Sequence, residues 1–283
     1  MKPELFGYTS YFVLWAVSAV VGVWVTTRTA RQAGFPGGRS LAGACGVAVA
    51  ILLGSKLLYL VEHAWLPDDP ALPRSQESIS QLLRYGFRIP GGILLVALTL
   101  PLICRKLHLP TRRFADLNFP GIGAGLVFIR IGCLLNGCCF GAVTRFPLAI
   151  TFPPGAEVYD WQLAHGLISV SAPHTLPVHP LQLYLALLGL GVYLLARHIQ
   201  RKQQFDGQVW LSCYLLFFGG TFFLELLRPR PLHLNLGLCV AVVLVTLGIR
   251  LRARQPTPLA AAPVPLYSEL VETRLSQRKR ISS

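Results

Sequence analysis

Long runs of apolar residues recur along the chain and are separated by shorter polar and basic segments. A helix needs about 20 mostly apolar residues to cross a membrane. The third run is the weakest of those found, because it is short and contains Pro101. We therefore predict an all-α polytopic membrane protein with seven transmembrane helices. Their expected bounds are Tyr8–Thr27, Leu41–Val61, Gly91–Leu107, Phe119–Leu135, Leu181–Ile199, Gln208–Leu227 and Leu234–Leu251.

The composition supports a membrane protein and excludes two other classes. Of the 283 residues, 53% are hydrophobic and only 13% are charged, and the mean hydropathy is +0.53. A soluble domain has about 25% charged residues, and a disordered chain has low hydrophobicity. Lysine and arginine number 26 against 12 aspartates and glutamates, which gives a net charge of +14. Such an excess suits basic loops that rest on anionic lipid headgroups.

The basic residues are distributed unevenly between alternate loops, and this predicts an orientation. Most lysines and arginines fall in the loops that share a side with the C-terminus, while the acidic residues favour the other side. Because cytoplasmic loops are enriched in lysine and arginine, the N-terminus is expected outside and the C-terminus in the cytoplasm. Two longer periplasmic loops are predicted, Glu62–Pro90 and Asn136–Pro180, the second with a strand-like stretch at Ala149–Phe152. Residues 1–251 would form the membrane domain and residues 252–283 a flexible basic tail.

Three ionisable residues lie inside the apolar runs: Lys56, Arg130 and Glu225. A charge within a membrane is costly, so it usually faces a cavity or a partner and marks a functional site. The alternative is structural, with Lys56 or Arg130 paired to Glu225 to lock the bundle. Arg228 and Arg230, beyond the sixth run, add positive charge at the outer level. These two arginines either belong to a functional site or only anchor the protein at the membrane interface.

Arg130 lies in the segment RIGCLLNGCCFG at the outer end of the fourth run, which is rich in glycine. Small residues in a membrane helix allow close packing. A guanidinium is a rigid fork that binds phosphate through paired hydrogen bonds. Asn136, Gly137 and Gly141 follow at the membrane exit, where glycine allows the backbone to approach a ligand. This cluster suits the phosphate of a phospholipid.

The same segment contains Cys133, Cys138 and Cys139. Together with His179 they could bind a soft metal, but the paired CxxC spacing of a structural zinc site is missing. Buried thiols acting as small apolar residues are favoured, and a disulfide with an unnamed partner is a further alternative. The sequence therefore predicts no metal site and no cofactor.

A second motif, VHPLQLYLALLG, opens the fifth run. Pro180 suits the first turn of a helix, where its missing N–H has no cost. Gln182 and Tyr184 follow within the first turns. His179 could accept a proton, since its usual pKa is near neutral, or it could cap the helix.

Four segments together resemble the prolipoprotein diacylglyceryl transferases of bacterial inner membranes: residues 54–60, 116–141, 179–184 and 222–229. Their order and spacing, the seven spans and the expected orientation agree with that family. The resemblance implies transfer of a diacylglyceryl group from phosphatidylglycerol to the lipobox cysteine thiol of a preprolipoprotein. Its partners would be the signal peptide of the preprolipoprotein and membrane lipids, and no nucleic acid is expected to bind. It implies catalytic roles for Arg130 and His179, and substrate binding by Lys56, Tyr59, Asn136, Gly137, Gly141, Gln182, Tyr184, Glu225 and Arg228.

The chain departs from the family pattern at positions expected to carry chemistry. Pro90 occupies the position of a family histidine, and Thr221 that of an arginine. Cys133, Cys138 and Leu185 replace an asparagine and two glutamates. Two alternatives follow: a phospholipid-dependent transferase with another acceptor, or a membrane protein that binds lipid or lipoprotein without catalysis.

Overall fold

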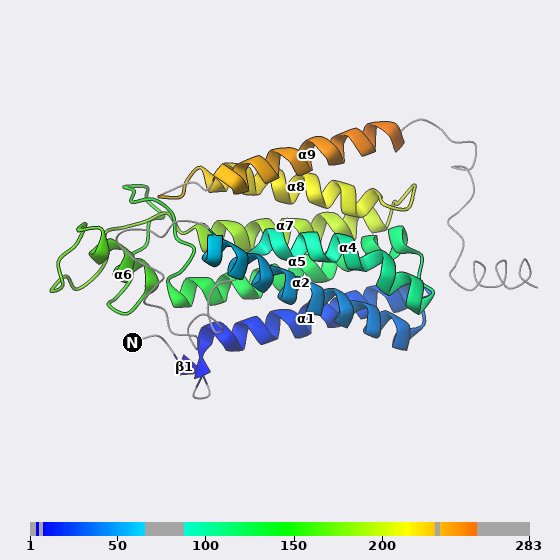
Figure 1. Cartoon of the computed structure of the whole chain (residues 1–283), viewed down its shortest axis with the longest axis horizontal. Helices are drawn as coiled ribbons and strands as arrows, with labels where there is room; N and C mark the ends of the chain where they lie inside the picture. Colours follow the sequence, from blue (N-terminus) through cyan, green and yellow to red (C-terminus); the bar gives the residue numbers. More distant parts are fainter. Residues whose placement is uncertain (1–3, 6–7, 66–87, 230–232, 254–283) are drawn as a thin grey trace, which may run out of the picture.

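Helices that run side by side make up most of this computed structural model, which describes residues 4–5, 8–65, 88–229 and 233–253 (Figure 1). The all-α prediction is confirmed, apart from a short antiparallel pair, β1 (Glu4–Leu5) with β2 (Tyr8–Thr9). The long helices match the seven apolar runs in order. The helices are α1 (Ser10–Gln32), α2 (Gly37–Trp65), α4 (Ile89–Leu107), α5 (Thr111–Asn136), α6 (Glu157–Ala164), α7 (Leu181–Gln200), α8 (Gln208–Glu225) and α9 (His233–Ala253).

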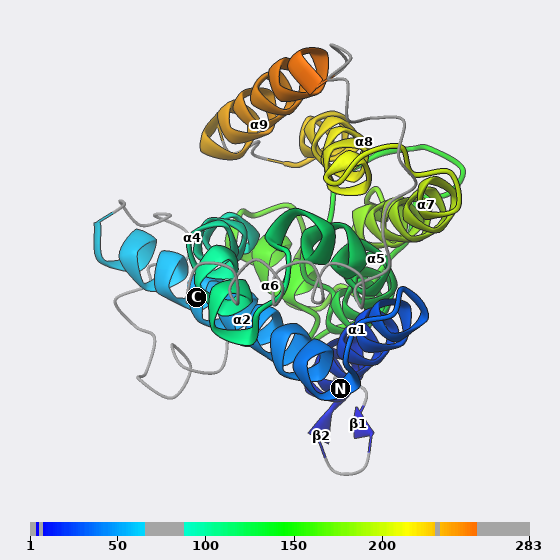
Figure 2. The same ribbon diagram turned by 90° about the vertical axis from the view of Figure 1, so that its right-hand side faces the viewer.

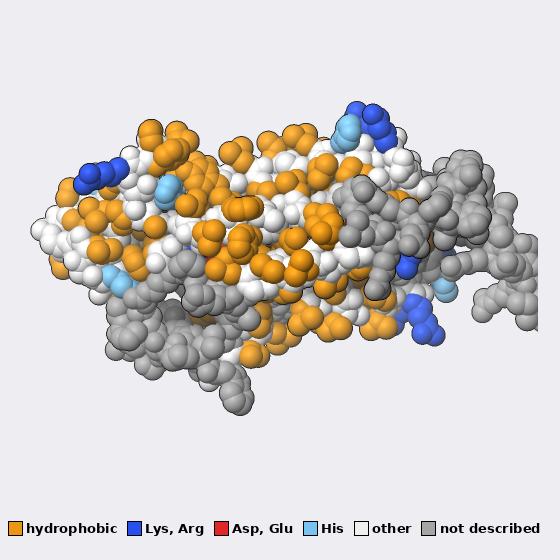
Figure 3. All heavy atoms as spheres, turned by 90° about the horizontal axis from the view of Figure 1, so that it is seen from above, with side chains coloured by type: hydrophobic (Ala, Val, Ile, Leu, Met, Phe, Trp, Pro, Cys, Tyr) orange, Lys and Arg blue, Asp and Glu red, His pale blue; other side chains and the backbone are white. Residues whose placement is uncertain are grey.

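Within the described residues, six helices are long and apolar enough to cross a membrane: α1, α2, α4, α5, α7 and α8. On α9 the apolar stretch found among the described residues, Leu236–Ile249, is shorter, so the seventh span and the orientation stay predictions. Leu94, Leu98 and Leu102 form an exposed stripe along α4. Figure 3 shows hydrophobic side chains over the flank of the molecule and basic ones toward its ends. This distribution suits a multi-pass membrane protein, whose flank faces lipid tails.

Most helices differ from the expected bounds by a few residues, and α5 begins at Thr111 rather than Phe119. Two of the differences have a local cause. The first span begins at Ser10 rather than Tyr8, because Tyr8 and Thr9 pair with the preceding strand. The third, which looked weakest from sequence, forms a continuous helix through Pro101. It begins at Ile89 with Pro90 in its first turn. The N–H group that proline lacks would have no partner within the helix at this position.

Helix α5 is the centre of the bundle and contacts α1, α4, α7 and α8 (Figure 2). Its glycines make these contacts close. A Cβ on Gly123 would lie 2.6 Å from the backbone nitrogen of Tyr193, and one on Gly121 would clash with the carbonyl oxygen of Gly22. The prediction that these glycines serve close helix packing is confirmed.

A buried carboxylate joins α5 to the start of α8. Asp116 accepts hydrogen bonds from the backbone N–H groups of Gly207, at 2.6 Å, and Trp210, at 2.9 Å. The Gln203 side chain donates a third. The first N–H groups of a helix have no partner within that helix, so Asp116 supplies from α5 the acceptor that a capping residue would provide.

We expect Asp116→Ala to lower the free energy of unfolding by about 2 kcal/mol, because it leaves buried N–H groups without an acceptor. Thermal unfolding in detergent micelles measures the change. The matched control is Asp160→Ala, at an exposed acid of α6, which should shift stability by no more than about 0.5 kcal/mol. Equal stabilities of the two variants would refute this role for Asp116.

The second long loop folds back onto the end of α5. Phe152, Val158, Tyr159 and Val178 form its small core. The strand expected at 149–152 is wrong except for a single bridge between Ile150 and Val178, since prolines on both sides of the stretch remove hydrogen-bond donors. Most of the first long loop, and all but two residues of the predicted tail, lie outside the described residues.

Candidate functional site

Arg130 is buried on the inner side of α5, with 7% of its surface exposed. Its Nε atom has no hydrogen-bond partner. The groups close enough to interact with its charge include Tyr11 and the thiols of Cys133, Cys138 and Cys139. A buried guanidinium with an unused donor is costly, so this geometry suits a position that receives an anionic group.

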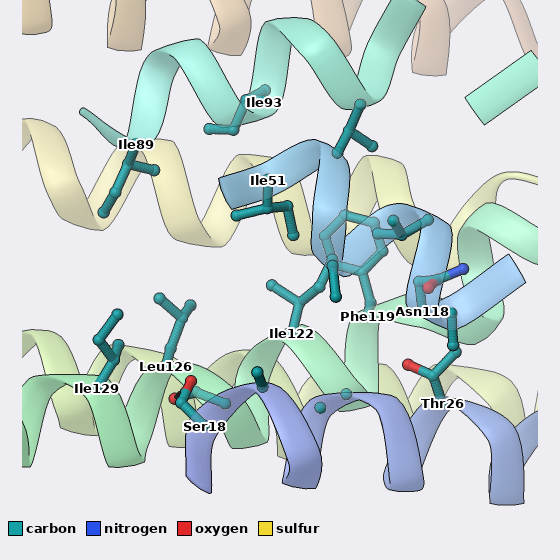
Figure 4. Close-up of a pocket in the computed structure, with 18 of the residues that line it drawn as sticks. Ser18, Thr26, Ile51, Ile89, Ile93, Asn118, Phe119, Ile122, Leu126 and Ile129 are labelled. Carbon is teal, nitrogen blue, oxygen red and sulfur yellow. Dashed lines mark hydrogen bonds between the residues drawn. The ribbon is translucent and has the colours of Figure 1, made fainter. Parts of the chain in front are cut away.

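An apolar cavity of about 530 Å³ reaches this arginine. Residues of α1, α2, α4 and α5 form most of its wall, which follows α5 from Thr111 to Cys133. Figure 4 shows Ile51, Ile122 and Leu126 pointing into it. Arg130 and Cys139 line the cavity where α5 ends. A long apolar chamber that ends at a cation is suited to a molecule with apolar chains and an anionic head.

The turn after α5 brings the cysteines together. Gly137 has a φ of 69°, and its N–H bonds to the carbonyl of Leu134 at 3.1 Å. The N–H of Cys138 bonds back to the carbonyl of Cys133, also at 3.1 Å. These bonds satisfy the last carbonyls of the helix in the way that is typical of a glycine C-cap. A Cβ on Gly137 would lie 2.7 Å from that of Ala156, so the turn also packs tightly.

The three Sγ atoms of Cys133, Cys138 and Cys139 all lie within 4.8 Å of one another. Cys133 and Cys138 are buried, Cys139 is partly exposed to the cavity, and all are free thiols. Hydrogen bonds from the other two thiols hold the pKa of Cys139 well below its usual range, and the Arg130 and Arg228 cations act in the same direction. Cys139 is therefore the thiol that most readily carries negative charge. His179 does not belong to the group found among the described residues.

His179 joins the loop after α5 to the start of α7. Its carbonyl accepts from the N–H of Gly141 at 3.0 Å, and its own N–H donates to Ala142 at 3.1 Å. The ring lies 5.9 Å from that of Phe146 and 6.4 Å from that of Tyr184, between centroids. Its Nδ1 atom is buried without a partner. The N-cap of α7 is Pro180, so the capping interpretation of His179 is wrong.

Two other polar residues hold the loop in place. The fully buried Gln182 donates through Nε2 to the carbonyl of Cys138 at 2.7 Å. Asn136 Nδ2 donates to Glu157 Oε2 on α6, at 3.4 Å. Neither side chain lines the cavity, and Tyr184 follows in the first turn of α7. These residues fix the position of the thiols and of His179.

The remaining predicted residues form two pairs. Glu225 is buried, and its Oε2 atom lies 2.8 Å from Nε of Arg228. On α2 the Lys56 ammonium lies over the Tyr59 ring, 4.9 Å from its centroid. The structural alternative for Glu225 was a pair with Lys56 or Arg130, whereas its salt bridge is to Arg228, three positions later. Arg230 lies outside the described residues.

Tyr11 is a site residue that the sequence analysis missed. It lines the cavity from α1 and interacts with Arg130. A hydroxyl at the start of the first apolar run, level with Arg130 near the end of the fourth, was the available signal. Glu157 was missed as well, because the helix that carries it was not predicted.

Comparisons with known proteins give one consistent result. The family model described as prolipoprotein diacylglyceryl transferase matches residues 5–254. The phosphatidylglycerol–prolipoprotein diacylglyceryl transferase of Clostridium tetani is 28% identical over 235 residues, covering 81% of this chain and 86% of that protein. The transferase of the same name, numbered 2, from Clostridium perfringens is 29% identical over 231 residues, covering 80% and 81%. That of Dehalococcoides mccartyi is 26% identical over 219 residues, covering 75% and 76%.

Proposed function

This chain belongs to the prolipoprotein diacylglyceryl transferase family and is a transferase, and we propose that it uses phosphatidylglycerol as donor. The acceptor is the lipobox cysteine thiol of a preprolipoprotein, at the outer leaflet of the bacterial inner membrane. The names of its relatives support both substrates. The observation that carries the proposal is the apolar cavity that ends at the buried Arg130, whose Nε atom has no hydrogen-bond partner.

The donor lies with its acyl chains along α5 and its phosphate at Arg130. Aliphatic side chains line the chamber, so it can exchange lipid tails with the bilayer at little cost. The guanidinium binds two phosphate oxygens through its fork. Lys56 and Tyr59 on α2, and the Glu225–Arg228 pair at the end of α8, take part in binding the headgroup and the acceptor.

The reaction replaces a C–O bond with a C–S bond. The acceptor thiol loses its proton, and the thiolate sulfur attacks the glyceryl carbon that carries the phosphate. The C–O bond breaks, and glycerol phosphate leaves with the electron pair. Arg130 stabilises the charge that develops on this phosphate, which is the largest kind of contribution a fixed cation makes to catalysis. His179 is the proposed proton acceptor, because its Nδ1 atom has no partner within the protein.

Expression in a bacterium depleted of its own diacylglyceryl transferase tests this function. We expect one model lipoprotein to gain the mass of a diacylglyceryl group, as measured by mass spectrometry. The matched control is a lipoprotein whose lipobox cysteine is replaced by serine, which should stay unmodified. If the chain is folded and inserted but the lipoprotein stays unmodified, the acceptor is different or the protein only binds its ligands.

A further inference from the structure

The three thiols at the end of the cavity have the separation of a metal site. Each Sγ lies within 4.8 Å of the other two. Tetrahedral zinc, with Zn–S bonds of about 2.3 Å, places its sulfur ligands about 3.8 Å apart. A movement of about 1 Å in the side chains would therefore bring Cys133, Cys138 and Cys139 onto one ion.

The backbone at this turn adopts an unusual conformation that gathers the thiols. Cys139 has a φ of 58°, in the left-handed region that a residue with a Cβ seldom occupies. Such a conformation costs about 1 kcal/mol or more and persists only where the surroundings fix it. Here the Gln182 bond to the carbonyl of Cys138 fixes it. The turn reverses the chain after Gly137, so two cysteines beyond the helix point back at the one within it.

The charge of the site fits a metal bound by three thiolates. A zinc ion with three thiolates carries a net charge of −1, and Arg130 beside it carries +1. The groups that interact with the Arg130 charge include these three thiols and Tyr11. The Arg130 cation would offset the charge of the metal complex, and its five N–H donors leave some for the phosphate of the lipid.

We propose that Cys133, Cys138 and Cys139 bind a zinc ion whose fourth position opens to the cavity and takes the acceptor thiol. Cys133 and Cys139 line the cavity, so a ligand inside it can reach the ion. Catalytic zinc sites have three protein ligands and one open position, and a thiol that binds the ion is deprotonated outright. The identity of the acceptor rests on the proposed function. The three thiols thus bind a metal, whereas the sequence favoured thiols that act only as small apolar residues.

The metal would change how the acceptor thiol loses its proton. The bonds that form and break would be the same as in the proposed function. The thiol gives its proton to water or to a base as it binds zinc. The bound thiolate attacks the glyceryl carbon, and the phosphate leaves with the electron pair of the broken C–O bond. The product is a neutral thioether, which is a weak zinc ligand and dissociates. No electron is gained or lost by the protein.

The first test measures metal binding by the full chain, purified in detergent with its thiols reduced. We expect about one zinc ion per chain by elemental analysis, and thiolate-to-metal absorption when cobalt(II) replaces zinc. The triple variant Cys133→Ser, Cys138→Ser, Cys139→Ser should lose both signals. Cys104→Ser and Cys213→Ser, at buried thiols elsewhere, should keep them. Failure of a chain with reduced thiols to bind metal, or full retention by the triple variant, would overturn the site.

The second test asks whether the acceptor thiol reaches the metal. A lipobox peptide with cysteine should change the visible spectrum of the cobalt protein, and the same peptide with serine should not. An unchanged spectrum with the cysteine peptide would overturn the fourth-ligand role. This readout needs no turnover, so it remains informative if the triple variant folds poorly.

Transfer assays separate this inference from the proposed function. Removing the metal with a chelator should lower diacylglyceryl transfer by about 100-fold, the size of a typical proton-transfer contribution, and zinc should restore it. Undiminished transfer after chelation refutes the metal's role and leaves the function standing. Metal binding and a spectral response without any transfer support the site and refute the proposed function.

Discussion

Arg130→Lys is expected to lower kcat/KM for diacylglyceryl transfer by about 100- to 1,000-fold, the loss that follows removal of one fixed donor to a developing negative charge. Lysine keeps the charge but has no planar fork, so it cannot make the paired hydrogen bonds to a phosphate. The longer reach of arginine matters too, because this side chain is buried at the end of the cavity. The assay uses mixed micelles of phosphatidylglycerol and a lipobox peptide.

The matched control is Arg201→Lys, at an exposed arginine that follows α7. It should leave kcat/KM unchanged, and both variants should unfold within a few degrees of the parent protein. A parent-like rate for Arg130→Lys would show that a point charge is sufficient and would refute binding of phosphate through the fork. A loss that comes with unfolding would assign Arg130 to stability instead.

The long helices of this protein could be predicted from sequence, because a run of apolar residues in lipid must form its backbone hydrogen bonds within its own helix. Pro101 did not break α4. The glycines of α5 indicated close packing, and the contacts of Gly121 and Gly123 confirm it. The partners of those glycines could not be predicted, since hydropathy gives the length of a span but not its neighbours.

The candidate site was harder to predict, because it depends on turns more than on composition. Cys138 and Cys139 lie beyond the end of α5, and a regular helix or an extended chain would place them away from Cys133. The left-handed conformations of Gly137 and Cys139 bring the thiols together. Glycine at 137 was a readable signal for the first conformation, but the sequence has no signal for the second.

Contacts between distant segments were not predictable either. Tyr11 reaches the site from α1, and Glu157 reaches Asn136 from a short helix in the second long loop. The Glu225–Arg228 pair, by contrast, was within reach of sequence reasoning, since the two residues lie three positions apart.

Gly141→Ala is expected to lower diacylglyceryl transfer by about 100-fold, because a misplacement of about 1 Å in an active site can cost that much. A Cβ at this position would lie 2.6 Å from Cβ of His179 and 2.9 Å from its carbonyl oxygen. Neither atom belongs to the flexible end of a side chain, so the loop itself must move away from α7. That movement weakens the bond from the N–H of Gly141 to His179 and displaces the cysteines.

Gly219→Ala is the matched control, since a Cβ on this glycine of α8 would meet no atom within 4 Å. Alanine in a helix is about 1 kcal/mol more favourable than glycine, so the control should keep its activity and unfold at the same or a slightly higher temperature. Gly141→Ala should instead lose about 1–3 kcal/mol of stability through overpacking. If both variants retain full transfer activity, the contact between Gly141 and His179 does not hold the site, and the proposed role of His179 as proton acceptor fails with it.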